Sequence, residues 1–105
     1  LMKALTAEEK SRITEEVIQF IAQELDVPLE RITPDTRIVD DLGGDSLIYI
    51  EIVEELKERY DIQQEIRLIG QYFMDNRIAT IQEIVDAVCD IIDAGIDFFP
   101  AEHKL

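Results

Sequence analysis

One serine of this chain lies in surroundings that suit it for covalent modification. Ser46 follows two glycines and Asp45, and it opens an apolar and acidic run that predicts a helix. Gly43 and Gly44 carry no side chain that would crowd the hydroxyl. Backbone N–H groups at the first turn of a helix also favour a phosphate bound beside them. These residues therefore predict an exposed hydroxyl that can carry a phosphate ester.

Other roles for this serine have less support. Ser46 lies outside the G-x-S-x-G pattern that places a nucleophilic serine on a sharp turn. The one histidine, His103, belongs to the C-terminal tail, and a serine hydroxyl without a base is a poor nucleophile at neutral pH. We therefore expect no enzyme. The alternative to a modified residue is an ordinary serine at a helix N-terminus, which an Asp-Ser-Leu triplet alone does not exclude.

The acidic segment before Ser46 does not fit a calcium loop. An EF-hand loop starting at Asp40 would place Leu42 and Gly44 where oxygen ligands are needed. A start at Asp41 would place Ile52 where a bidentate glutamate is needed. We therefore expect no specific metal site, and weak, nonspecific binding of divalent cations by the clustered carboxylates stays open as an alternative.

Two capping boxes mark the first and last of the helices that must position Ser46. Thr6 is followed three residues later by glutamate, and this box opens a helix over about 7–24. Thr80 starts a second box, and the apolar residues after it recur at helical spacing. Gly95 is a suitable end for that last helix.

Two further helices are expected between these. The second helix begins at Ser46, has Asp45 as its N-cap and ends near Tyr60. A short third helix is expected near 67–75. No segment alternates as a strand does, so the predicted fold class is all-α. The expected architecture is a small four-helix bundle with three main helices and a short third helix.

The segment 26–45 is expected to form a long ordered loop between helices one and two. Pro28 and Pro34 interrupt regular structure there. The segment is too long for a free linker inside a small domain, so apolar residues should pin it to the helices. The expected anchors are Val27, Leu29, Ile32, Ile38, Val39 and Leu42.

Helix two has one apolar stripe that we expect to face the core. Its members are Leu47, Ile50, Val53, Leu56 and Tyr60. The residues expected to point away from this stripe are Ile48, Glu51, Glu55 and Glu58.

Composition restricts the partners. The 105 residues include 24 acids and 10 bases, which gives a formal net charge of −14. Such a chain is not expected to bind nucleic acid or an anionic membrane, because phosphate binding needs a basic face. It favours partners with lysine and arginine patches. No apolar run approaches the ~20 residues of a membrane span, and one cysteine allows no internal disulfide. We expect a cytoplasmic monomer without membrane insertion.

The segment 40–47 resembles the prosthetic-group attachment site of acyl carrier proteins, where the serine of an Asp-Ser-Leu triplet bears 4′-phosphopantetheine. Glu51 and the Tyr-Asp-Ile run at 60–62 also match residue types that are frequent in this family. The order of the expected elements over about 6–94 is that of the family as well. The bare triplet is common by chance, whereas the triplet in this register is specific.

This resemblance implies a role for each residue of the triplet. Ser46 would be the attachment residue for the 4′-phosphopantetheine that comes from coenzyme A, with Gly44, Asp45 and Leu47 completing the cofactor site. The thiol belongs to the prosthetic group, so Cys89 is not needed and is expected in or beside the core. The interior of carrier proteins can also shelter an acyl chain. By resemblance the residues around such a chain would be Ile50, Val53, Leu56 and Val88.

The resemblance also implies partners and a docking face. The partners would be a phosphopantetheinyl transferase and acyl ligases, synthases or acyltransferases with basic docking patches. A solvated acidic face is the alternative interpretation of the helix-two glutamates. The expected docking residues are Glu51, Glu54, Glu55, Glu58, Ile48 and Ile52.

The chain departs from the family pattern in three places. Ile48 stands where the family often has an acidic residue, the segment between helices two and four is longer, and a tail with Phe98 and Phe99 follows Gly95. With Tyr49 and Ile52, Ile48 should give helix two extra exposed apolar surface. We therefore expect a specialised carrier with a dedicated partner.

The predicted protein is one domain over 1–105, with a core at about 6–94 and a C-terminal extension at 95–105. It would not be an enzyme but a carrier of acyl intermediates, held as thioesters, in fatty-acid, lipid or polyketide-type biosynthesis. An aminoacyl or D-alanyl carrier stays open as an alternative. So does an acidic interaction module that keeps the fold and is never modified.

Overall fold

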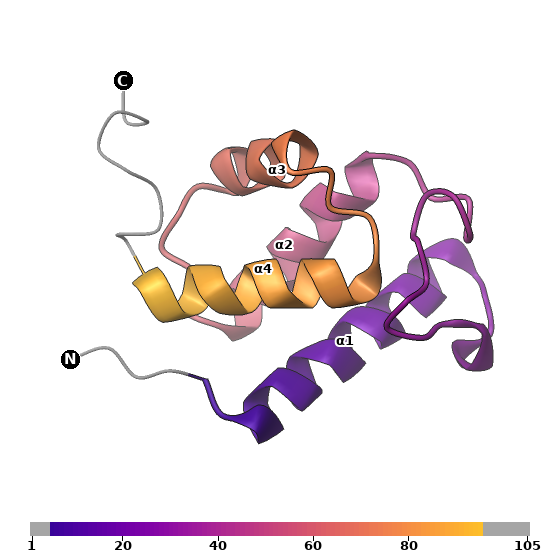
Figure 1. Cartoon of the computed structure of the whole chain (residues 1–105), viewed down its shortest axis with the longest axis horizontal. Coiled ribbons are helices and arrows are strands. Elements are labelled where there is room, and N and C mark those ends of the chain that lie inside the picture. The colour runs from indigo at the N-terminus through magenta and orange to yellow at the C-terminus, as the bar shows by residue number, and fades with distance from the viewer. Residues whose placement is uncertain (1–4, 96–105) are drawn as a thin grey trace.

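The computed structural model describes residues 5–95, and within that range it is built from helices (Figure 1). The bounds of the five elements, in chain order, are α1 Ala7–Leu25, the short 3-10 helix η1 Leu29–Arg31, α2 Leu47–Arg59, α3 Ile66–Asp75 and α4 Ile81–Ala94. No strand forms in this range; one isolated bridge joins Arg37 and Thr80. The expected all-α bundle with a short third helix is confirmed. The tail, including Phe98 and Phe99, lies outside the described residues.

Both predicted capping boxes are present. Thr6 Oγ1 accepts the Glu9 N–H at 3.1 Å, and the Glu9 carboxylate accepts the Thr6 N–H at 2.8 Å. Thr80 and Glu83 repeat this pair of bonds at 3.1 and 3.0 Å. Each box gives partners to N–H groups that a helix start leaves unpaired. Gly95 ends α4 with a φ of 61°, a conformation that glycine adopts at little cost, as expected.

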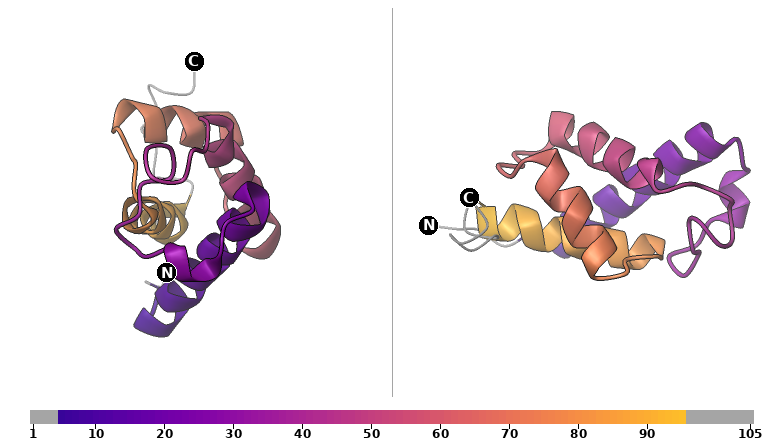
Figure 2. Two further views of the ribbon diagram at one scale, coloured as in Figure 1. Left: turned by 90° about the vertical axis from the view of Figure 1, so that its right-hand side faces the viewer. Right: turned by 90° about the horizontal axis from the view of Figure 1, so that it is seen from above.

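The helices pack in two main contacts, α1 against α4 and α2 against α3, and α2 also touches α1 (Figures 1 and 2). Gly70 allows the close approach of α3 to α2, because a Cβ on this residue would collide with Cδ1 of Ile50. Burial of each large side chain contributes about 1.5–3 kcal/mol, so the shared core stabilises all four helices together. Its largest fully buried members are Phe73, Ile13, Ile21, Ile38, Ile52, Leu56, Ile69, Ile81, Ile84, Ile91, Val17 and Val53.

The long loop is held by the start of α4. The N–H groups of Ile81 and Gln82, in the first turn of α4, donate to the carbonyls of Thr36 at 3.1 Å and Pro34 at 2.9 Å. The Ile38 N–H donates in return to the Ala79 carbonyl at 3.1 Å. A helix has no partners of its own for its first N–H groups, so the loop satisfies them and becomes ordered itself.

Four of the six expected loop anchors contact the core. Ile32 and Ile38 are buried, and Val27 and Leu42 pack partly buried against the core. The expectation is wrong for Leu29 and Val39, which are 49% and 41% exposed. Leu29 belongs to the short helix η1, none of whose residues is buried. Ile38 already fills the core position beside the loop. The next residue, Val39, lies in the turn that the Gly43 N–H closes on its carbonyl, and its side chain is exposed.

The Thr80 cap supports a prediction about stability. Thr80→Ala removes the acceptor for the Glu83 N–H, so we expect the free energy of unfolding to fall by about 1 kcal/mol in urea titrations followed by circular dichroism. Thr80→Ser should keep most of the wild-type stability. Thr14→Ala is a matched control, because Thr14 lies inside α1 and its hydroxyl donates to the Lys10 carbonyl. Equal losses for Thr80→Ala and Thr14→Ala would contradict the cap's role.

The same cap gives a prediction about pH. Hydrogen bonds from the backbone N–H groups of Thr80 and Ala79 lower the pKa of Glu83 below its ordinary value of 4.5. A carboxyl with a lowered folded-state pKa stabilises the fold above the unfolded pKa and loses that contribution as pH falls through the folded pKa. Stability should therefore fall below about pH 4.5 by less in Glu83→Gln than in wild type. Urea midpoints between pH 3 and 6 measure this, and parallel curves would contradict it.

Candidate functional site

Ser46 lies at the junction between the long loop and α2. Helix α2 begins at Leu47, one residue later than expected, and Ser46 is the cap residue with φ −66° and ψ −19°. Its side chain is exposed and makes no hydrogen bond with the residues that the structure describes. The hydroxyl is therefore open to an incoming reagent.

Asp45 takes the capping role that Ser46 leaves unfilled. Its Oδ1 accepts the Leu47 N–H at 3.0 Å, and its carbonyl accepts the Ile48 N–H at 3.1 Å. The expected N-cap action of Asp45 is thus present, although the residue lies one position before the cap. The consequence for Ser46 is direct: its hydroxyl is not needed to close the helix end.

The two glycines were expected to leave the Ser46 hydroxyl uncrowded, and the structure shows a different role for each. Gly43 has a φ of 77°, which side-chain-bearing residues rarely adopt, and a Cβ there would meet nothing within 4 Å. Gly44 is buried, its N–H donates to the Ile38 carbonyl at 3.1 Å, and a Cβ there would lie 3.2 Å from Cγ2 of Ile38. Gly43 therefore turns the chain toward Ser46, and Gly44 lets it cross close to the core.

An arginine that we did not single out from the sequence neutralises part of the acidic loop. Arg37 Nη2 lies 3.0 Å from Asp41 Oδ1, and its Nη1 lies 3.7 Å from Asp40 Oδ2. The side-chain hydrogen bond from Arg37 lowers the pKa of Asp41, and the same bond raises the pKa of Arg37. The four-residue spacing of Arg37 and Asp41 was the available signal. Near Ser46 this leaves Asp45 as a carboxylate without a cation among the described residues.

Helix α2 is turned differently from our expectation. Ile48 and Ile52 were expected on the exposed docking side, and this is wrong: they are 2% and 1% exposed. Tyr49 is also buried, and its ring packs edge-on against that of Phe73, with 6.0 Å between the two ring centroids. The reason is that α2 packs against α3 on one side and α1 on the other, so it buries a face wider than one stripe. The expected extra apolar surface from these three residues is absent.

Three members of the expected stripe lie at its edge or outside it. Leu47 is 65% exposed beside Ser46, and Ile50 is half-buried against Gly70. Tyr60 is half-buried, and its hydroxyl donates to Glu16 Oε1 at 2.5 Å. Burial and this bond raise the pKa of Tyr60 to about 12. Val53 and Leu56 are buried as expected.

Three glutamates form an exposed acidic row along α2. Glu51, Glu54 and Glu58 are exposed and have no ion-pair partner among residues 5–95. The fourth, Glu55, is different, because its carboxylate lies 2.7 Å from Arg59 Nη2. Arg59 also binds Glu16 on α1, and Lys57 donates to the Gln64 carbonyl at 3.0 Å. The two cations of α2 are therefore engaged elsewhere, and the row keeps its negative charge.

Residues expected around an acyl chain lie in the core behind the site. Val88 and Cys89 of α4 are 1% and 2% exposed, beside the buried Val53 and Leu56 in the core cluster. Burial raises the pKa of the Cys89 thiol to about 11. The expected core position of Cys89 is confirmed.

Two further features of the described part of the chain bear on function. No group of three or more histidine, cysteine, aspartate or glutamate side chains there is arranged to hold a metal ion. None of the described helices is long and apolar enough to cross a membrane. His103 lies outside the described residues.

Comparison with known proteins places this geometry in context. Residues 15–88 match the family model described as "Phosphopantetheine attachment site". An acyl carrier protein homolog of Clostridium acetobutylicum is 37% identical over 84 residues, which cover 80% of this chain and 82% of that protein. The acyl carrier protein of Chlorobium phaeobacteroides is 30% identical over 75% of this chain and 94% of its own. The acyl carrier protein of Helicobacter pylori is 32% identical over 62% of this chain and 95% of its own.

The position of Asp45 predicts how the site responds to substitution. Asp45→Ala removes the acceptor for the Leu47 N–H, so we expect a loss of about 1 kcal/mol in stability and faster hydrogen exchange at that amide. Asp45→Asn keeps a side-chain oxygen and should stay near wild type. Exchange of the Leu47 amide, followed by NMR, is the direct measurement. Unchanged exchange in Asp45→Ala would contradict the capping role.

Proposed function

We propose that this chain, which belongs to the acyl carrier protein family, bears its 4′-phosphopantetheine group on Ser46. The chain is a carrier protein and not an enzyme, and 4′-phosphopantetheine is its cofactor. The observation that supports Ser46 most strongly is its exposed hydroxyl, which bonds to none of the described residues and follows a glycine turn at the start of α2.

The residues at this position fit a covalent phosphodiester. Ser46 is exposed, and its hydroxyl has no hydrogen bond within the described residues, so a group attached there projects from the surface. The positive end of the α2 dipole favours a negative charge beside Ser46. The Leu47 N–H is already bound to Asp45, so this donor is not available to the phosphate. We infer that the cofactor is held by the ester bond and that Asp45 keeps the helix end in place.

The bound cofactor supplies a thiol that holds acyl groups as thioesters. The chain's own contribution is to present Ser46 away from the core and to hold the loop before it by backbone hydrogen bonds to the start of α4. A flexible arm fixed at one point raises the effective concentration of its cargo at each enzyme that docks.

The acidic row of α2 supports a docking role near Ser46. Glu51, Glu54 and Glu58 follow the attachment residue along one helix and keep their charge. Carrier proteins of this kind interact with a phosphopantetheinyl transferase and with acyl-processing enzymes. We propose that basic patches on these enzymes meet the row, with Glu55 contributing less because Arg59 binds it. Such contacts give fast and exchangeable association.

The proposal extends to the pathway and setting. We propose that the cargo is an acyl intermediate of fatty-acid, lipid or polyketide-type biosynthesis, and that the carrier acts as a cytoplasmic monomer. The acidic composition and the family membership support this choice.

Intact mass tests the attachment residue. The chain has two serines, Ser46 and Ser11, and Ser11 is an exposed residue of α1. After incubation with coenzyme A and a broad-specificity phosphopantetheinyl transferase, wild type and Ser11→Ala should each gain one phosphopantetheine. Ser46→Ala should gain none and keep its helical circular dichroism.

Two results would overturn the assignment. Modification of Ser46→Ala would place the cofactor elsewhere. A folded wild type that gains nothing would favour the unmodified interaction module.

A further inference from the structure

Helix α3 differs in charge from the rest of the bundle. α1 has five acidic and two basic residues, and α2 has four acidic and two basic residues. α4 has four acidic residues and no basic residue. In α3, Arg67 and Asp75 balance, and Arg77 follows two positions after the helix ends. Neither arginine has an ion-pair partner in residues 5–95, and both are exposed. With the exposed N-cap Glu65 counted as well, α3 and its two ends are neutral, and Arg77 is an exposed cation without an ion pair among the described residues of a chain of net charge −14.

The end of α3 lies toward the same end of the bundle as Ser46. Gly70 faces Ile50, and Phe73 stacks edge-on against Tyr49, so the C-terminal half of α3 pairs with the first turns of α2. Figures 1 and 2 show the end of α3 and the start of α2 on the side of the molecule where α4 begins. The right-hand view of Figure 2 shows the start of α2 and the end of α3 on opposite sides of this end, so an enzyme that covers the end of the bundle around Ser46 meets both the acidic row of α2 and the end of α3.

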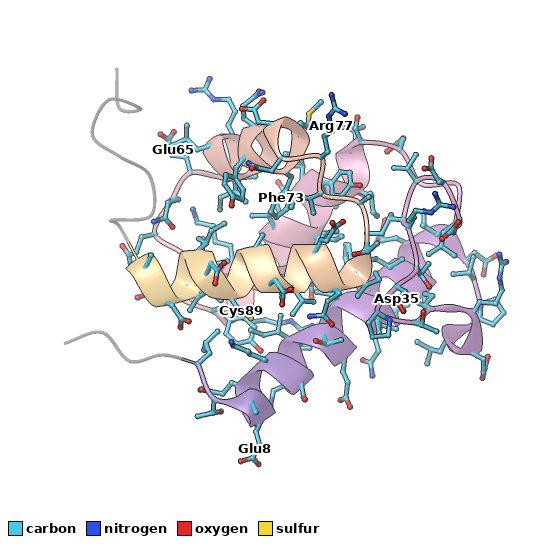
Figure 3. The ribbon with its side chains drawn as sticks, in the orientation of Figure 1. Glu8, Asp35, Glu65, Phe73, Arg77 and Cys89 are labelled. Atoms are coloured by element: carbon cyan, nitrogen blue, oxygen red, sulfur yellow. The ribbon has the colours of Figure 1, made fainter. Side chains whose placement is uncertain are left out.

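The end of α3 exposes an apolar and a cationic side chain together. Met74 is 61% exposed, and Figure 3 shows Arg77 at the outer edge of the bundle. The Ile78 N–H donates to the Phe73 carbonyl at 2.9 Å and the Arg77 N–H to the Met74 carbonyl at 3.2 Å, which is a Schellman end. Arg77 takes the left-handed position of this motif, with a φ of 53°, where glycine is usual. Strained positions of this kind are enriched at functional sites.

We propose that Met74 and Arg77 form the second half of the surface that partners meet over Ser46. The fitting partner is an enzyme whose docking face sets basic residues against α2 and, beside them, an apolar pocket with a carboxylate against the end of α3. A face that is basic throughout meets Arg77 with like charge. Arg77 thus discriminates between partners by repulsion as well as attraction. This inference rests on the proposed docking at Ser46.

The test uses two phosphopantetheinyl transferases of known structure as probes, one with a docking face that is basic throughout and one with carboxylates beside its basic patch. For Arg77→Glu we expect kcat/KM of Ser46 loading to rise with the first enzyme and fall with the second, each by roughly three- to tenfold. Met74→Ala should lower it with the second. The matched control is Arg12→Glu, the same charge change on α1, where the side chain lies near Tyr60 at the far end of α2.

The variant Arg77→Gly distinguishes a role of Arg77 in docking from a role in stabilising the fold. This variant removes the left-handed strain, so its thermal midpoint should rise above wild type while its loading rates change in the same directions as those of Arg77→Glu. Loading of wild type by either enzyme tests the proposed function by itself. If wild type is loaded but Arg77→Glu changes kcat/KM by less than twofold, or in one direction with both enzymes, the inference is overturned. If neither enzyme loads folded wild type, the proposed function fails and the inference fails with it.

Discussion

Three backbone hydrogen bonds between the loop and the start of α4 determine where the attachment residue lies. The carbonyls of Pro34 and Thr36 take the free N–H groups of the first turn of α4, and the Ile38 N–H returns a bond to Ala79. Ile38 is thereby held in the core, where Gly44 crosses it closely enough to donate to its carbonyl. From Gly44 the chain reaches Ser46 in two residues. The position of Ser46 thus depends on contacts with a helix that begins more than thirty residues later in the sequence.

Charge in this molecule is arranged by which cations are already engaged. Arg37 binds the acids of the loop, and Arg59 joins Glu55 to Glu16 of α1. These pairs lie near the surface and contribute little to stability individually. Their larger effect is on the charges that stay unpaired, because the acidic row of α2 and Arg77 at the end of α3 have no ion pair among the described residues. The surface around Ser46 is therefore patterned rather than uniformly negative.

Much of the fold could be predicted because it depends on local signals. The capping boxes at Thr6 and Thr80 and the glycine that ends α4 act within one turn, and each was read from neighbouring residues. The rotation of α2 could not be predicted in this way. Its apolar residues fit two overlapping faces, and the choice depends on contacts with α1 and α3, which the sequence of α2 does not contain. Ile48 and Ile52 were misplaced for this reason.

The same distinction applies to the site. Ser46 and Asp45 were identified from their motif, whereas the loop's attachment to α4 uses backbone carbonyls, which have no residue-type signature. The role of Arg77 was also hidden, because its left-handed conformation follows from the end of α3 and not from the residue. Sequence patterns therefore identify side chains that act by their chemistry more readily than groups that act by their position.

The burial of Cys89 has a consequence for the cargo. A thiolate exchanges readily with thioesters and disulfides, so a reactive cysteine on a carrier could remove the acyl group from the carrier's own arm. The single cysteine of this chain is 2% exposed, and its pKa is raised to about 11, so at neutral pH it is protonated and enclosed. The protein thus keeps its own sulfur out of acyl exchange and leaves that chemistry to the sulfur of the cofactor.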